Sequence, residues 1–126
     1  MKAVVTFLLT KNPDAALRFY RDVLGLTFIR DDGFALVFDC QGVMLRIGKT
    51  HGFNPAQNTV LGWEAEEIET TIRDLADKGV RFEHYPGMHQ DGQGIQTFPN
   101  GDKVAWFKDP DGNVLSISQH ASVLVA

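Results

Sequence analysis

The chain has 126 residues, a length sufficient for one globular domain with a hydrophobic core. Apolar residues make up 44% and charged residues 22%, which are ordinary values for a globular protein. The formal net charge is −4 at pH 7, and lysine and arginine occur singly, so no basic stripe indicates a nucleic-acid partner. No apolar run approaches the roughly 20 residues of a membrane-spanning helix, and no signal-peptide cleavage pattern is present. A single cysteine, Cys40, is typical of a cytoplasmic protein without disulfides.

The first half of the chain predicts a strand, a helix and three further strands. Val4–Thr10 is a β-branched and apolar run that is typical of a strand. Asn12 and Pro13 are typical of a helix start, and apolar residues at helical spacing continue to Gly25, where the helix is expected to end. The three strands that follow are expected at Thr27–Arg30, Phe34–Asp39 and Val43–Ile47.

The same order of elements recurs after a linker. Residues 49–58 contain Gly, Asn and Pro and are expected to be that linker. Thr59–Glu64 predicts a strand, and Glu66–Lys78, with Gly79 after it, predicts a helix. The remaining strands are expected at Val80–His84, Val104–Lys108 and Val114–Gln119.

A long polar and glycine-rich segment, Tyr85–Asp102, separates two of these strands and predicts a loop. Loops of this length in a compact domain are usually functional or mobile. Ile95 and Phe98 are the large apolar residues within it, and we expect part of the loop to pack against the protein through them.

An internal repeat supports this division into two halves. Ala35–Ile47 aligns with Ala105–Ile117 without a gap, and the second copy contains the turn sequence Asp109–Asn113. Cys40 aligns with Pro110, which predicts that it is a turn residue. The sequence therefore predicts an α+β fold of two tandem βαβββ modules that form a half-open β-barrel with a central trough. The expected boundaries are module 1 at residues 1–48, the linker at 49–58, module 2 at 59–120 and a tail at 121–126, all in one domain.

Two motifs resemble the signatures of a known family. The first comprises Phe19-Tyr20 and Val23-Leu24-Gly25-Leu26, and the second is Phe107–Asn113. Together they resemble the vicinal oxygen chelate superfamily, which includes glyoxalases, bleomycin-resistance proteins and extradiol dioxygenases. This resemblance implies the paired-module fold and a homodimer. In catalytic members it also implies a divalent metal, held by histidine on the first strand and glutamate on the last strand of a module.

The corresponding positions in this chain carry no such ligands. The first-strand positions fall on Val5 and Val60, and the last-strand positions fall on Arg46 and Ser116. Valine has no donor atom, arginine has no acceptor, and a lone serine hydroxyl is a weak ligand. We therefore expect no metal at the usual site and no other cofactor.

Strand alternation predicts what lines the trough instead, because residues two apart on a strand share a face. The expected walls are apolar with a few polar groups, which is the usual composition of a small-molecule site. Pairing across the turn places Lys108 opposite Val114 and Trp106 opposite Ser116. The predicted lining is Val5, Phe7, Met44, Arg46, Val60, Glu64, Trp106 and Ser116, with Ser118 on the same face.

Several of these residues allow a second interpretation. The aliphatic and aromatic ones are also what an ordinary core contains, and Trp106 is either core filler or a platform for an aromatic or cationic ligand. Arg46 either binds a carboxylate or phosphate or pairs with Glu64 inside a filled trough.

The histidines form no recognisable ligand pattern. His84 and His89 are near Asp91 in sequence, but their spacing across a Pro-Gly turn matches no standard metal site. His51 and His120 are expected to be solvated. A loop histidine at the trough mouth is a general-base candidate if the protein processes a substrate.

The function that these observations favour is metal-independent binding of a small organic molecule by a cytoplasmic homodimer, with no nucleic-acid or membrane partner. One alternative is a lyase, isomerase or dioxygenase of the same superfamily that uses a non-standard metal site or acid–base chemistry through Glu64 or a loop histidine. Another is a subunit whose trough is filled and whose surface binds a protein partner. The apolar tail after Gln119 is a candidate oligomer contact.

Overall fold

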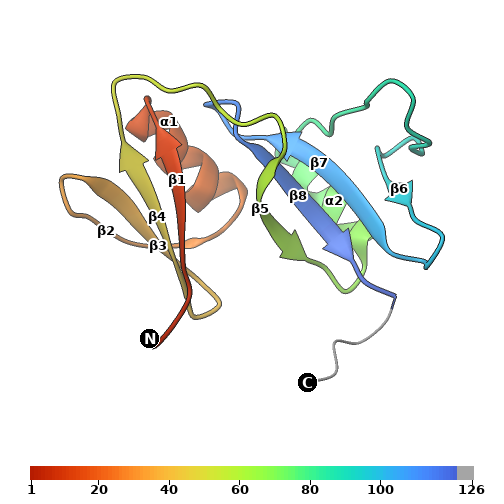
Figure 1. Cartoon of the computed structure of the whole chain (residues 1–126), viewed down its shortest axis with the longest axis horizontal. Helices are drawn as coiled ribbons and strands as arrows, with labels where there is room; N and C mark the ends of the chain where they lie inside the picture. Colours follow the sequence, from red (N-terminus) through yellow and green to blue (C-terminus); the bar gives the residue numbers. More distant parts are fainter. Residues whose placement is uncertain (122–126) are drawn as a thin grey trace. The chain divides into compact units, whose positions relative to one another are not determined.

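The computed structural model describes residues 1–121 and divides the chain into two compact units (Figure 1). Unit 1 comprises Met1–Gln57 together with Asp109–Asn113, and unit 2 comprises Asn58–Lys108 and the chain from Val114 onward. Each unit contains one four-stranded sheet and helical segments, as the two predicted modules require. Most of the predicted tail contact, residues 122–126, lies outside the described residues.

Sheet A, in unit 1, has the strand order β1-β4-β3-β2. The first strand runs parallel to β4, whereas the β4–β3 and β3–β2 pairs are antiparallel. The βαβββ order predicted for module 1 is therefore confirmed. The strands are β1 (Val5–Thr10), β2 (Thr27–Asp31), β3 (Ala35–Cys40) and β4 (Val43–Lys49).

The helical segment of unit 1 begins where the sequence predicts but changes its winding. In α1 (Pro13–Leu17) the Asn12 side chain accepts a hydrogen bond from the Ala15 N–H at 3.3 Å, and proline occupies the first turn. The chain then continues as a π-helix, η1 (Arg18–Val23), in which the Leu24 N–H bonds the Phe19 carbonyl. Tyr20, within this wider turn, is completely buried.

The first hairpin turns differently from its repeat. Gln41 and Gly42 both have positive φ, 52° and 87°, as a two-residue hairpin turn requires. Cys40 therefore pairs with Val43 as the last residue of β3. The prediction that Cys40 is a turn residue was wrong, because the gap-free alignment matched a two-residue turn to a five-residue one.

Sheet B, in unit 2, has the strand order β5-β8-β7-β6, with β5 and β8 parallel. Helix α2 (Ile68–Asp77) contributes the buried side chains of Ile68 and Ile72 to the core of this unit. The four strands are β5 (Thr59–Glu64), β6 (Gln96–Thr97), β7 (Lys103–Lys108) and β8 (Val114–Gln119), with β5 and β6 at the edges.

The predicted strand at Val80–His84 is not formed. Only Phe82 makes a bridge, to Phe107, while the other end of the same β7 edge pairs with β6 from within the predicted loop. The segment around Phe82 and strand β6 thus both lie along the same edge of β7. Ile95, just before β6, is 3% exposed, as expected, but Phe98 just after it is 40% exposed and does not pack down.

The turn at Asp109–Asn113, here called the DPDGN clasp, closes the β7–β8 hairpin and belongs to unit 1. The Tyr20 hydroxyl donates to Asp109 Oδ2 at 2.7 Å, and the Thr10 hydroxyl donates to Asp111 Oδ2 at 2.5 Å. The side-chain amide of Asn113 donates to the Leu9 carbonyl at 3.0 Å. Burial, reinforced by the Asp109 charge, raises the pKa of Tyr20, so the phenol stays protonated as a donor.

Removing the Tyr20 hydroxyl should destabilise the protein. Tyr20→Phe deletes the donor to a buried carboxylate, so we expect the free energy of unfolding to fall by ~1–3 kcal/mol. The measurement is urea denaturation at pH 7, with Tyr85→Phe as the matched control because Tyr85 is only partly buried. Equal losses in both variants would contradict the role assigned to the clasp.

Candidate functional site

One face of sheet A presents apolar side chains to solvent. Val5 and Phe7 on β1 are 41% and 67% exposed, whereas Leu8 and Thr10 on the opposite face are buried. In the strand register Val5 pairs with Met44 and Phe7 pairs with Arg46. The four site residues predicted in this half of the chain therefore share one face, and Val5 and Phe7 are outside the buried core of unit 1.

The Arg46 side chain on this face is already paired. Its Nη2 donates to Asp32 Oδ2 at 2.7 Å, and both side chains are about a quarter exposed, at 27% and 25%. The hydrogen bond from Arg46, helped by those from the Phe34 and Ala35 N–H groups, lowers the pKa of Asp32. Asp32, which the sequence analysis did not single out, thus neutralises Arg46 and takes the place proposed for Glu64.

The other four predicted residues lie on sheet B. The register confirms the predicted pairing of Lys108 with Val114 and of Trp106 with Ser116. Ser116 is also the partner of Gly62 on β5, and Ser118 is the partner of Glu64. Trp106, Ser116 and Glu64 therefore lie on one face, whereas Val60 lies where the register of β5 with β8 shifts between Thr59 and Leu61.

Trp106 is contacted by Glu83, within the segment of the missing strand, and by Tyr85 just after it. Its ring meets the edge of Tyr85 at a centroid distance of 5.8 Å and an interplanar angle of 72°. The Trp106 carbonyl also accepts a hydrogen bond from the Glu83 N–H at 2.8 Å. Sequence analysis missed this contact of Tyr85, because the loop that carries it has no regular register with β7.

The absence of a side chain at Gly62 leaves room for the Ser116 hydroxyl. A Cβ atom at position 62 would collide with Ser116 Oγ, so only glycine lets this hydroxyl lie against the β5 backbone. Gly62 thereby allows the Ser116 hydroxyl to lie on the same face of sheet B as Trp106.

The metal positions implied by the sequence resemblance do not fit a divalent ion. Val5 and Arg46 occupy the two in unit 1, and Val60 and Ser116 occupy the two in unit 2. Together these side chains offer one weak oxygen ligand and one positive charge. Across residues 1–121 no three His, Cys, Asp or Glu side chains gather in a way that could hold a metal, and this includes His84, His89 and Asp91.

Cys40 is not an activated nucleophile. It is a free, half-buried thiol, and burial, with the nearby Asp39 charge, raises its pKa. Because the thiolate is the reactive form, this environment reduces its reactivity.

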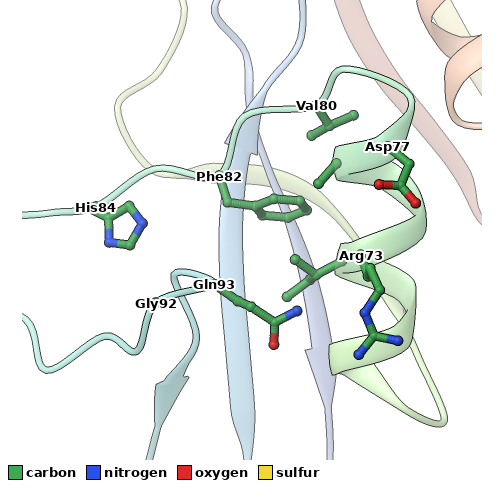
Figure 2. Close-up of a pocket in the computed structure, with 9 residues that line it drawn as sticks. Arg73, Asp77, Val80, Phe82, His84, Gly92 and Gln93 are labelled. Atoms are coloured by element: carbon green, nitrogen blue, oxygen red, sulfur yellow. The ribbon is translucent and has the colours of Figure 1, made fainter.

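A cavity of about 300 Å³ lies on the α2 side of unit 2 (Figure 2). The Phe82 ring points toward α2 with Val80 beside it, and Arg73 and Asp77 project from the helix. His84 lies on the other side, on the chain that leads into the long loop. The cavity combines an apolar floor with a polar rim, but its volume is at the lower end for ligand pockets. None of the eight predicted site residues lines it.

A second group that sequence analysis missed lies at the open end of the β7–β8 hairpin. His120 contacts Ser118 Oγ through Nε2 at 3.1 Å and Asp102 Oδ2 through Nδ1 at 3.3 Å. His120 was expected to be merely solvated. The signal was present in the predicted hairpin register, which, carried beyond Lys103, puts Asp102 opposite His120.

Comparison with known proteins establishes the family. The model of the glyoxalase/bleomycin resistance protein/dioxygenase superfamily matches residues 2–117, and the chain belongs to this superfamily. No curated protein shows significant sequence similarity to it.

Solved structures show the same fold at low sequence identity. A lactoylglutathione lyase from Agrobacterium tumefaciens is 21% identical, with a TM-score of 0.71 over 94% of both chains. A superfamily member from Sphaerobacter thermophilus is 20% identical, with a TM-score of 0.74 over 95% of this chain and 98% of that chain. A glyoxalase family protein from Bacillus anthracis, at 16% identity, has a TM-score of 0.73 over 95% of both chains. In the described part of the chain, no helix is long and apolar enough to cross a membrane.

Releasing Arg46 from Asp32 should create an anion site. Asp32→Asn keeps an oxygen for the Phe34 and Ala35 N–H groups but removes the charge that neutralises Arg46. We expect the variant to bind 9-anthracenecarboxylate more tightly than the parent, because the guanidinium then lacks its ionic partner. The measurement is the fluorescence anisotropy of the probe.

Asp31→Asn is the matched control, since Asp31 pairs with Lys49 rather than with Arg46. A gain of affinity in the Asp32 variant alone supports the neutralised state of Arg46. No gain, or the same gain in both variants, contradicts it.

Proposed function

We propose that this protein binds a small organic molecule without a resident divalent metal. The observation that carries the proposal is the combination of solvent-exposed apolar side chains on sheet A with metal-ligand positions that hold Val, Arg and Ser. Binding needs an accessible apolar surface and a few orienting polar groups, and it needs no chelate.

The charges on these faces favour a neutral or cationic aromatic ligand. Arg46 is neutralised by Asp32 and offers no free positive charge to an anion. On sheet B, Glu64 is an exposed carboxylate next to Ser118, and the half-buried Trp106 provides an aromatic face. A cation gains from contact with the indole ring, and a carboxylate on the same face favours positive over negative ligands.

We also propose that the protein works as a homodimer in the cytoplasm. The family resemblance favours the dimer, and exposed apolar residues such as Phe34 and Val43 offer surface for it. The single free cysteine, Cys40, suits a reducing compartment.

A pair of planar probes of similar size and opposite charge tests the ligand class. We expect saturable binding of 9-aminoacridine, measured by fluorescence anisotropy, and much weaker binding of 9-anthracenecarboxylate. Trp106→Leu should weaken binding of the cation by about 3- to 30-fold, the range of a cation–π contact.

Trp63→Leu is the matched control, because Trp63 pairs with the buried Ile117 and lies on the opposite face of sheet B. Circular dichroism of both variants establishes that they are folded. Tighter binding of the anion, or equal losses in the two tryptophan variants, would refute the proposed ligand class.

A further inference from the structure

At the end of the β7–β8 hairpin the Ser118 hydroxyl, the His120 imidazole and the Asp102 carboxylate lie next to one another. The last ladder pair is Lys103 with Gln119, and Asp102 and His120 are the next residues beyond these ends of β7 and β8. Ser118 lies on β8 two residues before His120, which follows the strand, and the two side chains are 3.1 Å apart. The five-residue DPDGN turn sets this register, because it pairs Lys108 with Val114.

The two nitrogens of the His120 ring have different partners. Nε2 lies 3.1 Å from Ser118 Oγ, and Nδ1 lies 3.3 Å from Asp102 Oδ2. This is the connectivity of a nucleophile, a general base and an orienting carboxylate. The cavity beside α2 and the buried DPDGN clasp contain no comparable arrangement of an accessible hydroxyl and an imidazole.

Asp102 is itself held in position. Its Oδ1 accepts a hydrogen bond from the Ala121 N–H at 2.8 Å, and its own N–H donates to Asn100 Oδ1 at 3.0 Å. The bond from Ala121, helped by His120, lowers the pKa of Asp102 and keeps it ionised. An ionised Asp102 accepts from Nδ1–H, which leaves Nε2 free to accept the Ser118 proton.

We propose that Ser118, His120 and Asp102 form a nucleophilic triad that hydrolyses small activated carboxylic esters. Ser118 Oγ attacks the ester carbonyl while His120 Nε2 takes the hydroxyl proton. Collapse of the tetrahedral adduct breaks the ester C–O bond, and His120 returns the proton to the departing alcohol. Water, deprotonated by His120, then attacks the acyl-serine, which releases the acid and restores Ser118.

The surroundings of Ser118 restrict the substrate. The Glu64 strand position lies next to it on β5, so an anionic acyl group is repelled and a neutral or cationic one is accepted. β8 is the central strand between β5 and β7, and its N–H groups are used in two ladders rather than in an oxyanion hole. The triad therefore requires esters with good leaving groups, such as aryl esters.

Solvent reaches the triad, as deacylation requires. The His120 side chain is 46% exposed and that of Asp102 is 23% exposed. Val104 is the β7 residue opposite Ser118, and Trp106 lies two residues further along β7 on the same face. From there the Trp106 ring can contact an aryl group of the substrate. This activity goes beyond ligand binding and does not depend on the proposed ligand class.

The test is hydrolysis of p-nitrophenyl acetate by the full chain, followed by release of p-nitrophenol. We expect Ser118→Ala and His120→Gln each to lose about tenfold or more in rate, the size of a lost base or nucleophile. His51→Gln, in the linker, is the matched control and should keep the parent rate. Equal rates in the Ser118 variant and the parent would overturn the proposal.

Covalent labelling keeps the test decisive if Ser118→Ala fails to fold. Diisopropyl fluorophosphate should add its phosphoryl group to Ser118, located by mass spectrometry of peptides, and Asp102→Asn should slow this labelling. Ser118→Cys should accumulate an acetyl thioester with p-nitrophenyl acetate. A label on any other residue, or no label and no thioester, would contradict the triad.

Discussion

The buried Asp109 carboxylate is the constraint on which the rest of the structure depends. It accepts hydrogen bonds from Tyr20, from the Asn113 side chain and from the N–H groups of Asp111 and Asn113, so it closes the DPDGN turn and holds that turn against Tyr20 within unit 1. Because the closed turn has five residues, it fixes the β7–β8 register. That register in turn places Trp106 beside Ser116 and Asp102 beside His120. The hydrogen bonds of the Asp109 carboxylate therefore determine the position of Trp106 on sheet B and the positions of Asp102 and His120 beside Ser118.

The residues at the superfamily's metal-ligand positions offer neither the charge nor the donor atoms that a divalent ion needs. Arg46 and Val5 occupy positions where a chelate needs anionic or neutral ligand atoms, and the charge of Arg46 is balanced by Asp32. The result on sheet A is an apolar surface with little net charge. On sheet B the exposed Glu64 pairs in register with Ser118, and Trp106 pairs in register with Ser116 on the same face. These charges are the basis of the proposal that the protein binds an uncharged or positively charged organic molecule rather than a phosphate.

Sequence patterns predicted the paired modules and the pairing of Trp106 with Ser116, because alternation and turn chemistry are local properties. They failed at Val80–His84, where the pattern of a strand is present but β6 already occupies part of the partner edge. They also failed to find Asp32 as the partner of Arg46, since an ion pair between a turn and a strand leaves no periodic signal. The contact of His120 with Asp102 was within reach, because the predicted hairpin register already implied it.

The central claim is that the protein binds organic ligands without a metal at the family's usual position. Elemental analysis of protein purified without chelators, combined with titration of 9-aminoacridine before and after dialysis against EDTA, tests it most directly. The account predicts a substoichiometric metal content and the same affinity in both titrations. A full equivalent of zinc, iron, manganese or nickel per chain, with binding lost after dialysis and restored by that metal, would contradict it.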